Sequence, residues 1–239
     1  DRGLAFDGVI GVSAGAIHGC SFLSRQRGRN IRYYKKYCRD WRFMSLRNLL
    51  FTGDIAGEKF CYHTLPEQLD PFDYETFNRN PAEFYVCCSN VKTGKPEYLH
   101  LTDMKEQIDY LRASASLPLV SRIVKAGGKL LLDGGCTDSI PVKAFMEMGY
   151  VRNVVILTRH RGYRKKDEGS SITRARYHRY PEFVKAVEQR PQVYNRTLEE
   201  IEVLEKEGSA FVIRPSIPLT IGRMEKNPQK LQSVYELGR

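Results

Sequence analysis

Short apolar runs alternate with stretches of helical spacing along the chain, and this alternation predicts an α/β protein. The apolar run at residues 5–10 is typical of a buried strand, and apolar residues recur at helical spacing over 14–26. Further strands are predicted at 83–88, 98–101, 130–133, 153–158 and 210–214, with residues 92–96 as the turn of a hairpin that joins the first two of these strands. Further helices are predicted at 104–113, 142–148, 181–190, 196–208 and 227–239, with the insertion 25–79 helical in pieces. Strand–helix alternation favours a three-layer α/β/α fold with a mostly parallel central sheet.

The length of the chain is typical of one domain of this class. Its 239 residues form a single predicted domain, 1–239, that can bury a sizeable core. The first residues, Asp1–Leu4, are expected to end a helix that Gly3 caps at its C-terminus. The helical pattern from Asn227 still continues at Arg239, so both ends are expected to be truncated within elements.

The sequence Gly11-Val12-Ser13-Ala14-Gly15 stands between the first predicted strand and the first predicted helix. A serine at such a turn, flanked by glycines, is the arrangement of a nucleophile elbow. The turn is expected to be so sharp that only residues without bulk fit on either side of Ser13. The amide of Ala14 points from the helix N-terminus toward the same spot, where it could hold an oxyanion. The alternative is a glycine-rich turn whose serine only caps the helix.

A second candidate is the acid of Lys129-Leu130-Leu131-Leu132-Asp133-Gly134-Gly135. An apolar run that ends in an acid and two glycines predicts a strand whose last residue projects into a tight turn, where α/β folds place their chemistry. Asp133 could equally be a turn former that binds its own backbone. Both readings stay open on the residues alone.

A serine nucleophile needs a group that accepts its proton. The chain has five histidines, namely His18, His63, His100, His160 and His178. His18 is five residues from Ser13 on a predicted helix, so it faces away from the serine, toward solvent. An α/β-hydrolase triad using His160 or His178 remains an alternative, although neither lies in a stretch typical of a triad.

Together these motifs resemble those of the patatin-like phospholipases, a family of acyl hydrolases that includes bacterial members. Gly11–Gly15 matches the family's G-x-S-x-G elbow, and Asp133-Gly134-Gly135 matches its D-G-G or D-G-A motif. Arg112–Pro118 resembles the A-S-x-A-x-P segment that precedes the aspartate, and Gly135–Pro141 resembles the sequence that follows it. The resemblance implies a serine–aspartate dyad of Ser13 and Asp133 that needs no histidine, metal or organic cofactor.

One family feature has no counterpart here. The family carries a G-G-G-x-R-G oxyanion loop after its first strand, 25–30 residues before the elbow, and nothing upstream of Asp1 supplies it. The resemblance therefore implies that the first strand is missing and that the chain without this loop has little activity, since one oxyanion donor contributes about 10²–10³ in rate. An open site around Ser13 is also expected.

Charge and cysteine content refine this picture. The net charge is +10, and basic residues gather at 159–166 and, with aromatic residues, at 25–47. We expect a solvated loop and an amphipathic helix with core aromatics, no nucleic-acid partner, and a possible contact with anionic membrane surfaces at 159–166. The six cysteines show no metal-binding spacing and are expected to be free thiols in the cytoplasm. No apolar run approaches a transmembrane length.

The resemblance thus implies a serine esterase of the phospholipase A or lipid esterase type, acting in lipid degradation. Ser13 attacks the ester carbonyl and Asp133 acts as general base. Gly11, Ala14 and Gly15 shape the elbow and oxyanion site, while Gly134 and Gly135 support Asp133. Ser13 and Asp133 are expected at the ends of neighbouring strands, on the carboxyl edge of the sheet. The Ser13 hydroxyl oxygen and an Asp133 carboxylate oxygen are expected within roughly 2.6–3.5 Å of each other. A non-catalytic lipid- or protein-binding module on a degenerate hydrolase fold is the alternative outside enzymes.

Overall fold

The computed structural model describes residues 5–167 and 169–238. The expected helix end at Asp1–Leu4, with Gly3 as its cap, and the terminal Arg239 lie outside the described residues. The strands are β1 (Gly8–Val12), β2 (Glu83–Asn90), β3 (Pro96–His100), β4 (Val124–Ala126), β5 (Lys129–Asp133), β6 (Asn153–Ile156) and β7 (Ala210–Ile213). The helices are α1 (Ala14–Leu23), α2 (Arg29–Tyr37), α3 (Leu46–Thr52), α4 (Tyr74–Asn78), α5 (Ile108–Ser114), α6 (Val142–Glu147), α7 (Ser171–Arg176), α8 (Pro181–Lys206) and α9 (Pro228–Leu237). A π-helix, η1 (Phe60–Leu69), and a 3-10 turn, η2 (Gly134–Cys136), complete the described elements.

The sheet is mixed, which corrects the expectation of a mostly parallel one. Strands β1, β2, β5 and β4 lie side by side in that order, and β3 pairs with β2. Only the β1–β2 pair of this sheet is parallel, whereas β2–β3, β2–β5 and β4–β5 are antiparallel. Strands β6 and β7 form a separate parallel pair. The α/β class is correct, but the direction of the strands is not.

Two tight turns cause most of this difference. The turn after β2 reverses the chain at Gly94, which has a φ of +65°, and returns it as β3, which confirms the hairpin predicted at residues 92–96. Gly127 and Gly128 both have positive φ and join β4 to β5, a two-residue hairpin in which glycine is favoured. The Gly-Gly pair between two apolar runs was a signal for this hairpin, and for the unpredicted strand β4.

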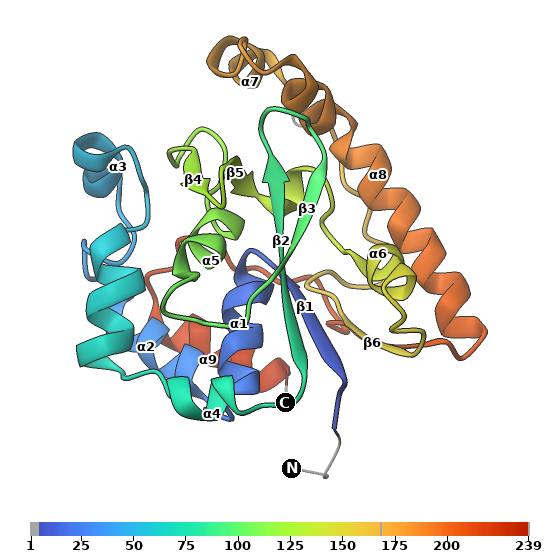
Figure 1. The fold of residues 1–239 in the computed structure, drawn as a ribbon, viewed down its shortest axis with the longest axis horizontal. Helices are drawn as coiled ribbons and strands as arrows, with labels where there is room; N and C mark the ends of the chain where they lie inside the picture. Colours follow the sequence, from blue (N-terminus) through green and yellow to red (C-terminus); the bar gives the residue numbers. More distant parts are fainter. Residues whose placement is uncertain (1–4, 168, 239) are drawn as a thin grey trace.

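Helices cover both faces of the sheet, in agreement with the expected layers (Figure 1). Leu131 of β5 belongs to a core shared with α1 and α5, and the next residue, Leu132, packs with Phe183 of α8 on the other face. Adjacent strand residues point to opposite faces, so this alternation places one helical layer on each side. In Figure 1, α8 flanks one side of the molecule, while α2, α3 and α4 lie on the opposite side.

The predicted helices 181–190 and 196–208 are one helix of 26 residues, α8, which continues through Pro191. Proline removes one intrahelical hydrogen bond and favours a helix end. Here Pro191 is buried, and Phe183 and Ile201 on either side of it are fully buried in separate cores. Packing on both sides of the proline therefore outweighs the local preference.

The basic and aromatic zone 25–47 is built as expected for an amphipathic segment. Tyr33, Tyr37 and Phe43 lie in a core with Phe60. The Arg29 guanidinium lies over the Tyr33 ring, 5.4 Å from its centroid. In the loop 159–166, Arg161 and Arg164 form ion pairs with glutamates of α8, at 2.9 and 3.6 Å. Much of this positive charge is thus balanced within the chain.

Candidate functional site

Ser13 occupies a strained turn between β1 and α1. Its backbone angles are φ 54° and ψ −122°, a region that non-glycine residues rarely adopt. Such strain at a strand-to-helix junction is the mark of a nucleophile elbow. The side chain of Ser13 is partly exposed, and Ala14 and Gly15 after it are exposed, so the turn is open to solvent as expected. Ser13 makes no side-chain cap hydrogen bond to α1, which argues against the capping alternative.

The two flanking glycines are not equivalent. A Cβ atom at Gly11 would lie 2.4 Å from the Cα of Ala16, so the turn requires glycine at this position. A Cβ atom at Gly15 would meet no described heavy atom within 4 Å. The expectation that both positions exclude bulk therefore holds for Gly11 and is wrong for Gly15, where the helix leaves open space.

Ser13 directly follows β1, and Asp133 is the last residue of β5, a strand that runs antiparallel to β1 on the other side of β2. Val12, the last residue of β1, pairs with Cys87 of β2, and Asp133, the last residue of β5, pairs with Cys88. Because β5 is antiparallel to β2 and β1 is parallel to it, the two strand ends meet across the middle of β2. The expected placement on neighbouring strands of one carboxyl edge is wrong, since β2 lies between them. The structure nevertheless brings the two residues together.

The segment Arg112–Pro118 connects the two residues. The Ser13 amide donates a hydrogen bond of 2.8 Å to the Ser114 hydroxyl, and this hydroxyl donates to the carbonyl oxygen of Cys87 at 2.6 Å. The Asp133 amide donates to the carbonyl oxygen of Ser116 at 2.8 Å. Ser114 is fully buried and Ser116 nearly so. The sequence indicated this segment only through a resemblance, and the structure shows that it hydrogen-bonds to the backbone of both residues.

Asp133 is buried, and its environment controls its charge. Burial raises the pKa of the Asp133 carboxyl above its ordinary value, while the Ser13 hydroxyl, the Gly135 amide and the charges of Arg190 and Arg223 lower it. Its Oδ2 atom is buried without a hydrogen-bond partner. The Ser13 hydroxyl lies near enough to lower the pKa of the Asp133 carboxyl, and the expected oxygen-to-oxygen distance of the pair stays a prediction. Catalytic hydrogen bonds are often open in proteins without substrate.

Both sequence readings of the Asp-Gly-Gly motif hold in part. Asp133 Oδ1 accepts a hydrogen bond of 2.8 Å from the Gly135 amide, as a turn former would. A Cβ atom at Gly134 would lie 2.2 Å from the carbonyl oxygen of Cys87, so only glycine lets the turn approach β2. The turn fixes Oδ1 and leaves Oδ2 available for chemistry.

The two histidines of the triad alternative contact backbone carbonyl oxygens away from Ser13. His160 contacts the carbonyl oxygen of Arg161 at 2.7 Å, and His178 contacts that of Ala175 at 3.1 Å. His18 is exposed on α1. Within the described residues, no histidine has a hydrogen bond to Ser13 or Asp133, so the triad alternative gains no support from geometry.

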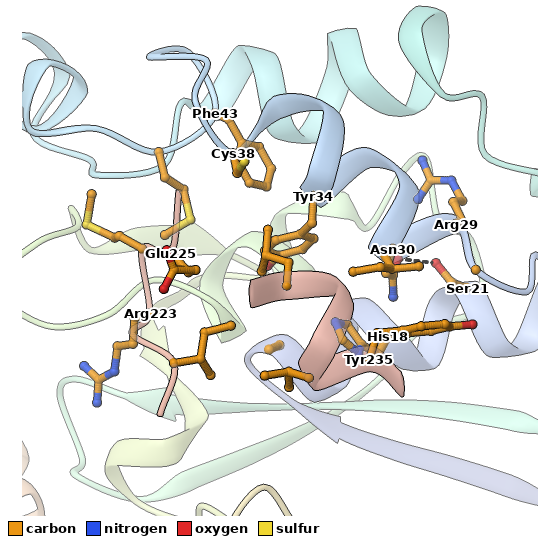
Figure 2. Close-up of a pocket in the computed structure, with 18 of the residues that line it drawn as sticks. His18, Ser21, Arg29, Asn30, Tyr34, Cys38, Phe43, Arg223, Glu225 and Tyr235 are labelled. Atoms are coloured by element: carbon orange, nitrogen blue, oxygen red, sulfur yellow. Dashed lines mark hydrogen bonds between the residues drawn. The ribbon is translucent and has the colours of Figure 1, made fainter. Parts of the chain in front are cut away.

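A pocket of about 510 Å³ opens beside the elbow. Ala14, His18 and Phe22 of α1 form one wall, Tyr34 of α2 forms another, and α9 with the loop before it closes the third (Figure 2). Figure 2 shows α9 lying across the ends of these side chains. The remaining apolar lining comes from Ile31, Phe43, Met44, Ile221, Met224, Leu231, Val234 and Tyr235. Such a volume is in the range of ligand sites.

Residues 5–167 and 169–238 contain no group of three or more His, Cys, Asp or Glu side chains placed to hold a metal ion. None of the described helices is both long and apolar enough to cross a membrane. All six cysteines are free thiols.

Comparison with known proteins gives two family matches along the chain. The model of the patatin-like phospholipases matches residues 1–146, more than half of the chain. A domain of unknown function, DUF6363, matches residues 180–239. The uncharacterized protein YjjU of Escherichia coli (strain K12) is 29% identical over 157 residues, which cover 64% of this chain and 43% of that protein. The chain thus spans less than half the length of this relative.

Proposed function

Because the chain belongs to the patatin-like phospholipase family, we propose that it hydrolyses carboxylic esters of lipids with Ser13 as nucleophile and Asp133 as general base. The observation that carries this proposal is the convergence of a strained, partly exposed Ser13 on a buried carboxylate with an unpartnered oxygen. A buried carboxyl with a raised pKa is a stronger base than an exposed one.

The reaction proceeds in two steps. Ser13 Oγ bonds to the ester carbonyl carbon while its proton passes to Asp133 Oδ2, and the carbonyl oxygen becomes an oxyanion. The amides of Ala14 and Gly15, exposed at the N-terminus of α1, face this oxyanion. The intermediate then expels the alcohol, which takes the proton from Asp133. Asp133 next accepts a proton from water, which attacks the acyl-serine, and the proton returns to Ser13 as the acid leaves.

The pocket beside Ala14 supports an ester with an apolar acyl chain. Its apolar walls begin at the elbow, so a chain attached to an acyl-Ser13 could extend between α1, α2 and α9. Burying such a chain contributes about 0.8 kcal/mol for each CH₂ group. The acyl part of the substrate is therefore assigned to this pocket.

Helix α3 supports contact with an anionic lipid surface. Leu46, Leu50 and Phe51 are 67%, 83% and 79% exposed, so this short helix presents apolar side chains to solvent. Arg47 lies over the rings of Trp41 and Phe51 and adds positive charge to the same patch. Apolar side chains flanked by cations are typical of interfacial helices. In Figure 1, α3 projects from the body of the molecule.

Labelling with a fluorophosphonate tests the nucleophile directly. We expect one adduct, on the peptide that contains Ser13, and its loss in the Ser13→Ala and Asp133→Asn variants. Alanine variants of His160 and His178 should label at the rate of the unmodified protein, because neither touches the serine. A label on another residue, or none, would refute the nucleophile, and loss of labelling in a histidine variant would favour the triad.

A further inference from the structure

The pocket beside the elbow has polar side chains in the wall that α1 forms. Ala14, His18 and Ser21 recur along α1 at spacings of four and three residues, and all three line the pocket. Residues with this spacing lie on one face of a helix. The wall therefore runs from the elbow past the His18 imidazole to the Ser21 hydroxyl. His18 is turned away from Ser13, as expected, and lines the pocket.

The Asn30 amide of α2 lies beside this imidazole. Ser21, which is buried, donates its hydroxyl to Asn30 Oδ1 at 2.8 Å. Because Ser21 and His18 are neighbours on one face of α1, the amide bound to Ser21 is also close to His18. Figure 2 shows the Asn30 side chain and the His18 ring on facing sides of this part of the pocket. The contact with Ser21 holds the amide oxygen and leaves the amide nitrogen for a ligand.

The two side chains together present both donors and an acceptor. The pocket walls around His18 lower the pKa of its imidazole below the ordinary value, so the ring is neutral at pH 7. A neutral imidazole carries one N–H donor and one acceptor nitrogen. Within the described residues, neither ring nitrogen of His18 nor the Asn30 nitrogen hydrogen-bonds to another protein group. A ligand atom between them can therefore both accept and donate.

A plain hydrocarbon chain does not fit this arrangement. An acyl chain on Ser13 that follows α1 reaches His18 one helical turn after Ala14, about 6 Å along the helix axis. A CH₂ group there displaces water from His18 and Asn30 without replacing its hydrogen bonds, which is unfavourable. A hydroxyl group has one donor and two acceptor lone pairs, so it matches both side chains. A few placed polar groups in an apolar pocket are what makes such a site specific.

We propose that His18 and Asn30 bind a hydroxyl group on the acyl chain of the ester, at about the sixth carbon from the carbonyl. The inference rests on the proposed function. The position follows from the 6 Å path along α1, because an extended chain advances about 1.2 Å per bond. The hydroxyl accepts from the Asn30 amide and donates to the acceptor nitrogen of His18. The carbons beyond it continue toward Phe22, which also lines the pocket.

Three decanoyl esters of one soluble alcohol test the proposal. The first chain is unsubstituted, the second has a hydroxyl at about the sixth carbon, and the third has it at the terminal carbon. We expect the unmodified protein to have a kcat/KM at least about tenfold higher for the mid-chain hydroxyl than for the plain chain. In His18→Phe this ratio should fall below one, because the hydroxyl then meets an apolar wall. A ratio near one in the unmodified protein, or an equal preference for the terminal hydroxyl, would overturn the proposal.

Two further variants keep the test interpretable. His63→Phe is the matched control, because His63 is exposed, pairs with Glu67 and does not line the pocket. Its ratio should equal that of the unmodified protein. The double variant Ser21→Ala with Asn30→Leu removes the hydroxyl and its acceptor together, which leaves no buried group unpaired. It should lower the ratio by about tenfold even if His18→Phe fails to fold, and an unchanged ratio would overturn the role of Asn30.

A binding measurement separates this inference from the proposed function. In the Ser13→Ala protein, calorimetry compares the plain decanoyl ester with the mid-chain hydroxylated ester. We expect the hydroxylated ester to bind at least about tenfold more tightly, and the difference to vanish when His18→Phe is added. Equal binding of the two esters by the Ser13→Ala protein would overturn the proposal. If the unmodified protein hydrolyses none of the esters, the proposed function fails, while this comparison still decides whether the pocket recognises the hydroxyl.

Discussion

The backbone amide of Ser13 donates a hydrogen bond of 2.8 Å to the hydroxyl of Ser114, a residue 101 positions further along the chain. The same hydroxyl donates to the carbonyl oxygen of Cys87, on the strand that separates β1 from β5. Ser114 therefore ties the elbow to the central strand, and its neighbour Ser116 ties down Asp133 through the Asp133 amide. This one buried segment therefore contacts the backbone of both proposed catalytic residues.

Removing the Ser114 hydroxyl should disturb the elbow specifically. In Ser114→Ala the Ser13 amide loses its acceptor and the Cys87 carbonyl loses a donor, which should cost about 1–3 kcal/mol of unfolding free energy. We expect kcat to fall by at least about tenfold while KM changes little, because the nucleophile moves rather than the binding surface. Ser24→Ala is the control, since Ser24 is equally buried at the far end of α1. A similar kcat in both variants would show that Ser114 has no positioning role.

Ser13 itself should be dispensable for stability. Ser13→Ala is expected to abolish ester hydrolysis with a change of melting temperature of only a few degrees, because a partly exposed hydroxyl stabilises little. Ser13→Gly should be as inactive but more stable, by about 1 kcal/mol, because glycine adopts the φ of 54° without strain. Denaturant unfolding and an ester assay measure both. More than a tenth of the original activity in either variant would refute the nucleophile.

Asp133→Asn should abolish activity without lowering the stability of the protein. The amide keeps an oxygen for the Gly135 amide but cannot accept the serine proton, so activity should be lost. The folded pKa of Asp133 is raised, so the folded state binds its proton more tightly than the unfolded state. Its ionisation thus reduces stability as the pH rises from the unfolded pKa through the folded pKa. The asparagine variant should therefore be at least as stable as the original at pH 7, and unfolding of the variant would contradict this.

The pH dependence of the unmodified protein follows from the same carboxyl. Only the ionised form accepts a proton, so kcat/KM should rise with pH through the pKa of Asp133. Because burial raises this pKa, the midpoint should lie above the value of about 3.9 for an exposed aspartate. A rate profile on a soluble ester measures it. A midpoint near 6.5 that disappears in a histidine variant would instead indicate a triad.

Filling the pocket should shorten the accepted acyl chain. Val234 of α9 lines the pocket, and Val234→Trp places a large ring among its apolar walls. We expect kcat/KM for long-chain esters to fall by at least about tenfold, since several CH₂ groups lose their contacts, and that for acetyl esters to stay within twofold. Val193→Trp on the exposed side of α8 is the control. Equal effects on long and short chains would place the acyl chain elsewhere.

Helix α3 should contribute to vesicle binding. Replacing Leu50 and Phe51 by aspartate removes exposed apolar area and adds negative charge, so binding to vesicles that contain anionic lipid should weaken by about tenfold or more. Hydrolysis of a soluble ester should be unchanged. Ile172→Asp on α7, at a comparably exposed position, is the control.

Charge reversal at Arg164, Lys165 and Lys166 tests the basic loop in the same vesicle-binding assay, and the largest loss of binding is expected at low salt.

The sequence by itself determined the local features of this site. Gly11 and Ser13 between an apolar run and a helical pattern were enough to predict the elbow, because a strand-to-helix turn of this sharpness has few sequence solutions. The acid before two glycines predicted the turn of Asp133, and helical spacing predicted α1 and α9. These features depend on residues close together in the chain.

Only the tertiary structure decided how these pieces meet. The direction of a strand depends on which strand it pairs with. No local pattern specifies that β5 pairs with β2 and so runs antiparallel to β1. Burial around Pro191 merges two predicted helices, because packing outweighs propensity. The Ser114 hydroxyl joins the Ser13 amide to the Cys87 carbonyl on β2 across 101 positions of the chain, a contact that no local pattern indicates. Long-range contacts of this kind arise from the whole fold.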